Sequence, residues 1–261
     1  VLRELDKTDL IIGTKVRIAG DEFKDISRAI ENQIDNSLKR LGIDTIDIVY
    51  THNTIGPERN VSSGTLSVED LNAIVKVFEN AVAAGKLKYW GFNGLGQTES
   101  VKEALGRYSP SGIHSCYNML NPTSGYALPK TFPYQNYEEL MTMASEDGIG
   151  TVGIRILAGG ALSGSLDRHP IAQQNVAPIA TSSTFQEDVS RTAAFEFLVK
   201  EGFVNNLVEA SVRFAISNDN LDTALIGLSN FDQLKKAVDY ANQGSLSQEA
   251  LDKINEIWTV S

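Results

Sequence analysis

Cysteine is almost absent from this chain of 261 residues, since Cys116 is the only one. A single cysteine excludes an internal disulfide framework and a metal site built from several thiolates, and a reducing cytoplasm is the simplest location. Positive charge is also scarce: 33 acidic residues outnumber 23 lysines and arginines and leave a net charge of −10. This acidic balance argues against nucleic acid as the main partner.

Long apolar runs and several well-known motifs are missing as well. No stretch approaches the roughly 20 apolar residues of a membrane-spanning helix, and no segment is typical of a signal peptide. The glycines at 91, 94 and 96 have the wrong order for GxGxxG, and neither a P-loop nor HExxH is present. The three histidines, His52, His114 and His169, form no obvious ligand cluster with carboxylates. We therefore expect no metal, and a metal-dependent barrel lyase is only a distant alternative.

What the chain does have is a regular alternation of strand and helix patterns. Strands are predicted at 10–16, 45–51, 88–92, 113–117, 151–157 and 223–226, and helices at 25–41, 67–84, 98–108, 137–147, 185–200, 205–217, 232–242 and 248–258. Alternating βα units without a convincing hairpin predict an α/β fold with a parallel sheet and helices outside it. No linker divides the chain, so we expect one domain over residues 1–261. The rival, a doubly wound sheet, usually carries the missing glycine motif.

Two of the predicted strands end on ionisable residues. Lys15 closes the run IIGTK, and His52 closes IDIVYTH. The C-terminal ends of parallel barrel strands form the active face, and a buried lysine is costly unless it is paired or used. The alternative is that each side chain is simply bonded to a neighbouring loop. Tyr50 shares a face with His52 one layer deeper, and we interpret it as core.

Several separate motifs in register give the chain a family resemblance. In order, they are IIGTKV, IDIVYTH, KYWGFNG, HSCYNML, IRILAGGALSG and ALIGLSNFDQLKKAV. The sequence resembles the aldo-keto reductases over nearly its whole length, and most of all the branch with aldose and L-galactose dehydrogenases. The resemblance implies a (β/α)8 TIM barrel, of which this chain would hold about six of the eight βα units. The start at Val1 rather than Met agrees with an expected loss of the N-terminal part.

The resemblance also implies an activity, which is hydride transfer between NAD or NADP and a carbonyl or the corresponding alcohol. The family site combines Asp, Tyr, Lys and His, and here Lys15 and His52 match the last two. The Asp and the Tyr, which is the general acid, would lie upstream of Val1. Tyr50 is a weak candidate to replace that acid. The alternative is a non-catalytic aldo-keto-reductase-like protein that binds the cofactor as a ligand, sensor or subunit.

Cofactor contacts are also implied by the resemblance. Asn93 stands in the family's Ser-Asn pair, His114 replaces its usual Gln, and Ile154 with Arg155 replaces the aromatic residue that stacks on nicotinamide. The pyrophosphate and adenosine contacts fall on Leu157, Gly159, Gly227, Ser229, Gln233 and Lys236. Alternatively, Ser229 or Asn230 is simply a helix cap. Only Lys235 and Lys236 could reach a 2′-phosphate, so NAD or dual use is slightly favoured.

The substrate is expected to be a sugar or another small carbonyl compound, and a homo-oligomer is possible. Substrate loops are predicted at 53–67, 121–136 and 158–184. The second loop holds Tyr126, Phe132 and Tyr134, which offer aromatic surface to a ligand or are ordinary loop packing.

Overall fold

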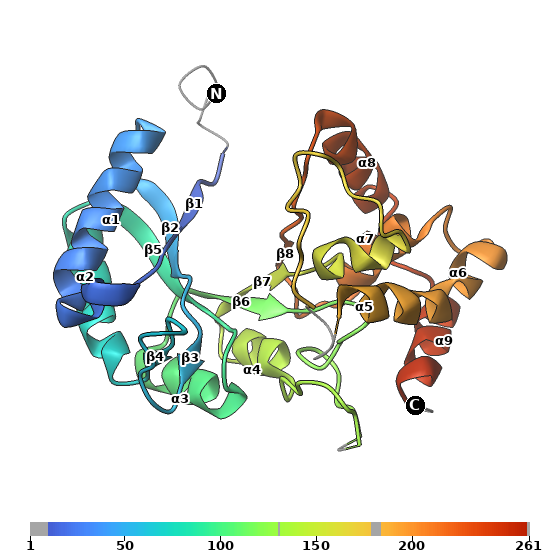
Figure 1. Cartoon of the computed structure of the whole chain (residues 1–261), viewed down its shortest axis with the longest axis horizontal. Coiled ribbons are helices and arrows are strands. Elements are labelled where there is room, and N and C mark those ends of the chain that lie inside the picture. The colour runs from blue at the N-terminus through green and yellow to red at the C-terminus, as the bar shows by residue number, and fades with distance from the viewer. Residues whose placement is uncertain (1–9, 130, 179–183, 260–261) are drawn as a thin grey trace. The chain divides into compact units, whose positions relative to one another are not determined.

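A computed structural model gives the fold and describes residues 10–129, 131–178 and 184–259 (Figure 1). The chain divides into two compact units. Unit 1 comprises residues 1–114 and 147–150, and unit 2 comprises residues 115–146 and 151–261. The expectation of one domain over residues 1–261 stays a prediction.

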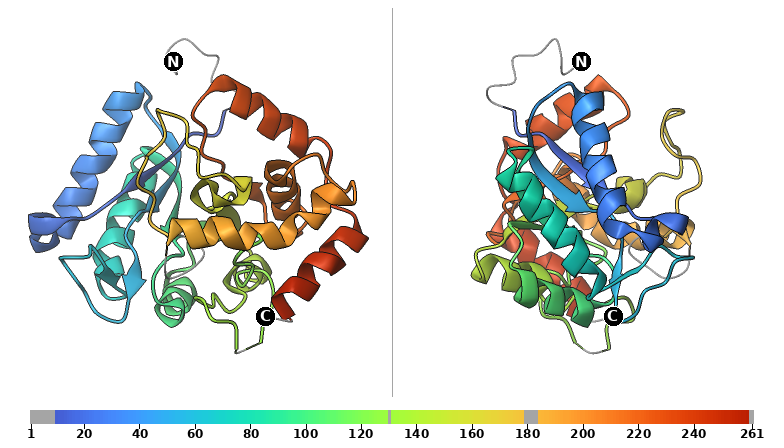
Figure 2. Two further views of the ribbon diagram at one scale, coloured as in Figure 1. Left: turned by 45° about the vertical axis from the view of Figure 1, so that its right-hand side comes forward. Right: turned by 90° about the vertical axis from the view of Figure 1, so that its left-hand side faces the viewer.

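Unit 1 is a parallel sheet with helices against one face. Its elements are β1 (Gly13–Val16), α1 (Ile26–Leu41), β2 (Ile46–Thr51), β3 (Ile55–Gly56), β4 (Leu66–Ser67), α2 (Asp70–Ala83), β5 (Leu87–Asn93), α3 (Thr98–Tyr108) and the first residues of β6 (Gly112–Cys116). The strands pair in the order β1-β2-β5-β6, and β3 pairs with β4 in a separate small sheet. Within unit 1 all these pairings are parallel. Figures 1 and 2 show α1 and α2 together on one side of the strands, where α1 contacts β1 and α2 contacts β5.

The two faces of the unit 1 sheet differ in chemistry. The face toward the helices is apolar and buried, with Val16, Val49 and Trp90 among its members. The opposite face carries the row Lys15, Tyr50, Gly91 and Gly112, which are partners across β1, β2, β5 and β6. Since side chains alternate along each strand, the next residues on this face lie two positions further on. The polar face thus gathers the strand-end residues that the sequence singles out.

Local signals explain where the helices of unit 1 begin and end. The Asp25 carboxylate accepts a hydrogen bond from the Arg28 N–H and caps α1, and Gly42 ends it with a φ of 68°. The predicted capping box before α2 forms, because the Asp70 N–H donates to the Ser67 hydroxyl and the Ser67 N–H donates to the Asp70 carboxylate. The helix itself begins at Asp70, three residues later than the predicted range.

Unit 2 packs mainly helices around an aromatic core. Its elements are the last residues of β6, α4 (Leu140–Glu146), β7 (Gly150–Ile154) apart from its first residue, a 3-10 helix (Ala158–Ser163), α5 (Phe185–Thr192), a 3-10 helix (Ala193–Phe195), α6 (Phe197–Lys200), α7 (Leu207–Ala215), β8 (Thr223–Ala224), α8 (Phe231–Ala241) and α9 (Gln248–Thr259). Strand β7 pairs with β8 in parallel. The core includes Tyr117, Phe214 and Trp258.

Three local differences from the predicted elements have physical causes. The predicted helix 137–147 begins only at Leu140, because Glu138 and Glu139 have positive φ and the Tyr137 N–H donates to the Thr123 hydroxyl. The predicted helix 185–200 breaks after Thr192, whose hydroxyl bonds to carbonyls of Asp188 and Ala161. The short β3–β4 pair falls inside the predicted loop 53–67, where two-residue strands leave no periodic signal.

Candidate active site

Lys15 projects from β1 onto the polar face of the unit 1 sheet. It is the register partner of Tyr50 and is half-buried. Burial lowers the pKa of the ammonium from its ordinary value. Among the described residues, no carboxylate lies within ion-pair distance of Lys15, and its Nζ makes no hydrogen bond. The predicted lysine is therefore a half-desolvated cation that has no ion-pair partner among the residues that the structure describes.

His52 directly follows β2, and its backbone is fixed by β1. Its N–H donates to the Val16 carbonyl over 2.7 Å. The imidazole is exposed, yet its pKa is lowered, first by partial desolvation and then by the charges of Lys15 and Arg17. The two cations therefore act on the same imidazole ring, which holds it in the neutral form near pH 7.

Two buried asparagines fix the backbone around His52. The Asn93 side-chain amide donates to the carbonyls of His52 over 3.2 Å and Asn53 over 3.3 Å. The Asn53 side chain accepts from the Ile18 N–H and donates to the carbonyls of Ile18 and Gly64. These bonds satisfy buried polar groups and hold the ends of β1 and β2 and the following loop in one arrangement. Because the Asn93 amide hydrogens are used in this way, its Oδ1 is the atom left for a ligand.

His114 lies on β6, opposite Asn93 in the neighbouring strand. Its ring stacks on Tyr50, and only 3% of its surface is exposed. Burial, helped by the charges of Lys15 and His52, lowers the pKa of His114 to about 3. At neutral pH this imidazole is uncharged, with one nitrogen able to donate and the other able to accept a hydrogen bond.

Tyr50 is a core residue, as the sequence pattern indicates. A Cβ at Gly91 would approach its ring to 2.6 Å, and a Cβ at Gly112 would lie 2.8 Å from its hydroxyl. The two glycines therefore leave the room that the Tyr50 ring occupies. Burial raises the pKa of Tyr50 to about 12. That shift is opposite to the one required of a general acid that works near neutral pH.

A cavity of about 760 Å³ lies within unit 2. Its walls include the predicted cofactor residues Arg155, Leu157, Gly159, Gly227, Ser229, Gln233 and Lys236. Its volume falls in the range of roughly 300–1,000 Å³ that is usual for small-molecule sites. The charged residues of the lining are three cationic ones, Arg155, Arg168 and Lys236, and one acidic one, Asp167. This composition suits an anionic ligand such as a diphosphate.

The turn after β7 forms one wall of this cavity in an unusual backbone conformation. Arg155, Ala158, Gly159 and Gly160 all have positive φ, between 47° and 107°. Arg168 braces the turn, since its Nη1 donates to the Gly159 carbonyl over 2.8 Å and its Nε donates to the Gln173 carbonyl over 2.7 Å. The glycine-rich turn permits close approach of a ligand to the backbone.

The start of α8 forms another wall. The Asn230 side chain accepts from the Gln233 N–H and caps the helix, so Asn230 and not Ser229 is the cap. The Gln233 side chain reaches back to accept from the Ser229 N–H over 2.7 Å. Helix N-termini favour anions. Lys236 lines the cavity one turn into the helix, whereas Lys235 does not.

The positions of the remaining predicted site residues give less support to a role in ligand binding. Ile154 is outside the cavity lining, and its carbonyl accepts from the Tyr117 N–H. Tyr126 stacks in the aromatic core with Tyr117 and Phe214, so ordinary packing is the correct interpretation for it. The Cζ atom of Arg191 lies 3.9 Å from the centroid of the Tyr134 ring. Residue 130 and residues 179–183, which belong to predicted substrate loops, lie outside the described residues.

Sequence reasoning missed Arg17, Gln33, Asn53 and Arg168. Arg17 follows Lys15 by two positions, the spacing of one strand face, and this alternation was the available signal. The other three act through contacts between distant segments, for which the sequence holds no local signal. Within residues 10–129, 131–178 and 184–259, no three His, Cys, Asp or Glu side chains gather as a metal site would require. In the same ranges, none of the helices combines the length and the apolar character needed to cross a membrane.

Known proteins resemble the chain in sequence. The profile of the Aldo/keto reductase family matches residues 2–259. L-glyceraldehyde 3-phosphate reductase of Escherichia coli (strain K12) is 23% identical over 233 residues, which cover 85% of this chain. The chain spans 61% of the length of that reductase. L-galactose dehydrogenase of Arabidopsis thaliana is 21% identical over 97% of this chain and 72% of the dehydrogenase. A probable voltage-gated potassium channel subunit beta of the same plant is 22% identical over 98% of this chain and 76% of its own length.

Solved structures resemble the chain in fold. The aldo-keto reductase AKR11C1 from Bacillus halodurans, in its apo form, matches with a TM-score of 0.67 at 20% identity and covers 99% of this chain and 75% of that chain. Its holo form matches with a TM-score of 0.66. The fold is thus that of an aldo-keto reductase. Since the family profile spans almost the whole sequence, the chain belongs to the Aldo/keto reductase family.

Proposed function

We propose that the protein is an NAD(P)-dependent oxidoreductase that interconverts a small aldehyde or ketone and the corresponding alcohol. The observation that carries the proposal is the pair of Lys15, on β1, and His52, directly after the neighbouring parallel strand β2, with the charge of Lys15 lowering the pKa of the His52 ring. A cation and a neutral imidazole close together at the strand ends suit a reaction that builds negative charge on oxygen. The proposal includes six βα units of a (β/α)8 barrel and a single domain over residues 1–261.

Each functional residue of unit 1 is assigned its own role in the reaction. The Lys15 ammonium stabilises negative charge that develops on the carbonyl oxygen. Its lowered pKa also makes it a better proton donor near neutral pH than an ordinary lysine ammonium. A ring N–H of neutral His52 donates a hydrogen bond to the same oxygen and orients the substrate. Tyr50 is not assigned the role of acid, because it is buried and its pKa is raised to about 12.

The residues of unit 2 are assigned to the adenosine diphosphate part of NAD or NADP. Arg155 and Arg168 provide charge for the diphosphate, and the positive-φ turn at Gly159 and Gly160 allows the backbone to approach it. The start of α8, with Ser229 and Gln233, is assigned to the adenosine. The assignment of Asn93 and His114 to the nicotinamide amide stays a prediction from the sequence resemblance. When bound, the nicotinamide ring supplies or accepts the hydride.

A second candidate function is a non-catalytic cofactor-binding protein. It is favoured by the unsuitability of Tyr50 as an acid and by the similarity to a protein described as a potassium channel beta subunit. The half-buried Lys15 favours the enzyme, because a binding protein gains nothing from a half-desolvated cation. A cytoplasmic location and a homo-oligomer belong to the proposal as well, and cell fractionation and light scattering test them.

The deciding experiment combines cofactor binding with turnover. Binding of NADH and NADPH is measured by fluorescence, and turnover is followed by the reduced-nicotinamide absorbance with a panel of aldehydes, sugars and phosphorylated sugars. Turnover that Lys15→Met abolishes supports the enzyme. Binding without any turnover supports the second candidate. Absence of binding contradicts both.

A further inference from the structure

Arg155 has a backbone conformation that residues other than glycine rarely adopt. It directly follows β7, lines the cavity of unit 2 and has a φ of 61°. In this left-handed region a Cβ crowds the backbone, so the conformation persists only where the surrounding structure holds it. The same turn has Gly159 and Gly160, which adopt positive φ without that strain. An arginine at position 155 therefore requires a support from its surroundings.

Asn118 provides this support. Its Nδ2 donates to the Arg155 carbonyl over 3.1 Å, and the Ala158 N–H donates to the same carbonyl over 2.7 Å. Asn118 Oδ1 accepts from the N–H groups of Leu120 and Asn121, both over 3.0 Å. The Asn118 side chain is 1% exposed, so its hydrogen bonds are made within the protein. One buried amide thus joins the turn after β6 to the turn after β7.

The guanidinium end of Arg155 lies close to two buried polar groups. Burial raises the pKa of the Cys116 thiol and of the Tyr137 phenol, and the positive charge of Arg155 opposes this shift in both groups. Cys116 and Tyr137 are buried, whereas Arg155 is only half-buried. Since a guanidinium has five N–H donors, two such neighbours leave others for a ligand. Arg155 is therefore positioned at both its backbone and its guanidinium.

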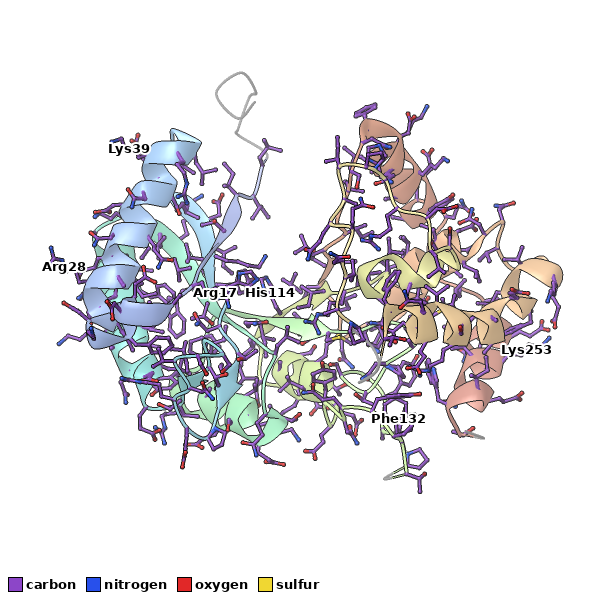
Figure 3. The ribbon with its side chains drawn as sticks, in the orientation of Figure 1. Arg17, Arg28, Lys39, His114, Phe132 and Lys253 are labelled. Carbon is purple, nitrogen blue, oxygen red and sulfur yellow. The ribbon has the colours of Figure 1, made fainter. Side chains whose placement is uncertain are left out.

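A buried asparagine is often only a structural support, and Asn121 is the example in the same turn. It is 2% exposed, and its Nδ2 donates to the Gln135 carbonyl over 2.9 Å. This bond closes the loop that carries Phe132, which lies at the outer edge of unit 2 in Figure 3. Neither Asn121 nor Gln135 belongs to the cavity lining. Asn118 differs from Asn121 because the bond that it donates ends on a residue of the cavity wall.

We propose that Asn118 is a positioning residue of the cofactor site, which holds Arg155 in its left-handed conformation and so keeps the guanidinium in the cavity wall for the cofactor diphosphate. This proposal rests on the proposed function and adds a residue to its binding site. A guanidinium that is fixed before binding loses less side-chain freedom when the ligand arrives. Without the Asn118 amide, the backbone at Arg155 relaxes and the guanidinium is displaced. Cofactor affinity then falls, although Asn118 itself lies outside the cavity lining.

Cofactor affinity in matched variants tests the proposal. Asn118→Ala should weaken NADH and NADPH binding by about tenfold in fluorescence titrations, and Asn121→Ala, which removes a similarly buried amide, by less than about twofold. Both variants should lower the urea midpoint, because each loses buried hydrogen bonds. In turnover assays, Asn118→Ala should raise the KM for the cofactor and leave kcat within about threefold. Equal losses of affinity in the two variants overturn the proposal.

A double substitution shows whether Asn118 acts through Arg155. Arg155→Gly removes the guanidinium, and glycine adopts positive φ without support. In that background Asn118→Ala should change cofactor affinity by less than about twofold, whereas independent effects would multiply and overturn the proposal. If Asn118→Ala does not fold, Asn118→Ser replaces it with the same expectations. The serine hydroxyl still accepts from N–H groups of the turn but is too short to reach the Arg155 carbonyl.

Inorganic diphosphate separates failure of this proposal from failure of the proposed function. It is titrated calorimetrically into the full chain and into the variants. Binding that weakens about tenfold in Asn118→Ala, without any binding of NADH or NADPH, keeps the role of Asn118 and contradicts the oxidoreductase. NADH binding that Asn118→Ala leaves unchanged keeps the oxidoreductase and overturns the role of Asn118. Absence of binding for diphosphate and both cofactors contradicts the two proposals together.

Discussion

The ring of Tyr50 stacks on the imidazole of His114, with 3.9 Å between ring centroids and 24° between ring planes. Both residues are buried, and burial moves their pKa values in opposite directions. The phenol is raised to about 12 and the imidazole is lowered to about 3, so both rings are uncharged at neutral pH. The stack is therefore a neutral, packed contact beside Lys15 and His52, and a separate prediction follows for each ring.

The first prediction concerns the hydroxyl of Tyr50. Tyr50→Phe keeps the stacked ring and removes a group whose raised pKa makes it a poor proton donor. We expect turnover within about threefold of the wild type and a change in the free energy of unfolding of about 1 kcal/mol or less. Tyr50→Ala is the comparison, because loss of the ring should cost about 3–5 kcal/mol. Steady-state kinetics and urea unfolding measure both variants. If Tyr50→Phe instead lost about 100-fold or more in turnover, Tyr50 would be identified as the acid.

The second prediction concerns acid stability. His114 binds a proton only near pH 3 in the folded protein, whereas an unfolded histidine binds it near 6.5. The unfolded chain therefore holds more protons between these values, and stability falls as pH falls through that window. Between pH 7.5 and 5 the loss due to this residue is about 2 kcal/mol. His114→Gln should remove that part of the slope in urea unfolding measured at several pH values. A slope equal to that of the wild type would contradict the buried, neutral state of His114.

The third prediction concerns Lys15. Lys15→Met removes the cation that acts on the carbonyl oxygen, so kcat should fall by about 100-fold or more. Cofactor affinity should change by less than about threefold, because the cofactor contacts proposed for unit 2 are untouched. Lys88→Met is the matched control, since Lys88 is exposed and pairs with Asp47 over 2.7 Å. Loss of cofactor affinity with survival of kcat would show that Lys15 binds rather than catalyses.

The helices were predictable where their signals are local. Helix α3 has the predicted limits of Thr98 and Tyr108, and α1 differs from its predicted range by one residue. By contrast, the delayed start of α4 depends on a bond between the Tyr137 N–H and the Thr123 hydroxyl, 14 residues away. Propensity and periodicity contain no information on such a contact.

The site residues likewise divide into those that local sequence patterns predict and those that they do not. Lys15 and His52 were predictable because a strand pattern ends at each of them. Arg17 was not predicted because the strand pattern stops at Val16, although the alternation of side chains between the two faces continues beyond that residue. Asn53 and Gln33 act on Ile18 and Arg17 from 35 and 16 residues away, and only the folded chain brings them together. The polar supports of a site are therefore harder to predict from one sequence than its charged members.

The fourth prediction concerns the turn in the wall of the unit 2 cavity. Gly160 has a φ of 107°, and an added Cβ would lie 3.0 Å from the Arg168 guanidinium. Gly160→Ala should weaken NADH and NADPH binding by about tenfold, because it displaces Arg168 and strains the turn at a cost of about 1–2 kcal/mol. Gly202→Ala is the control, since Gly202 has a φ of 79° and no atom would lie within 4 Å of its Cβ. It should share the strain and keep cofactor affinity. Equal losses of affinity in the two variants would place the cofactor outside the cavity.

The last prediction concerns the choice between NAD and NADP. Lys236 lines the cavity and follows Ser229 by seven residues. The neighbours of Ser229, Leu228 and Asn230, carry no charge, so Lys236 is the cation of α8 that is available in the cavity for a 2′-phosphate. Lys236→Gln should weaken NADPH binding by about five- to tenfold, equivalent to about 1–1.4 kcal/mol, and NADH binding by less than twofold. Lys235→Gln, on the adjacent residue outside the cavity, should change neither. Calorimetric titration at low salt measures the affinities of the wild type and both variants for NADH and NADPH, since screening weakens such contacts. Equal losses for NADH and NADPH would mean that Lys236 contacts the diphosphate that both cofactors share, and discrimination would then have to come from another residue.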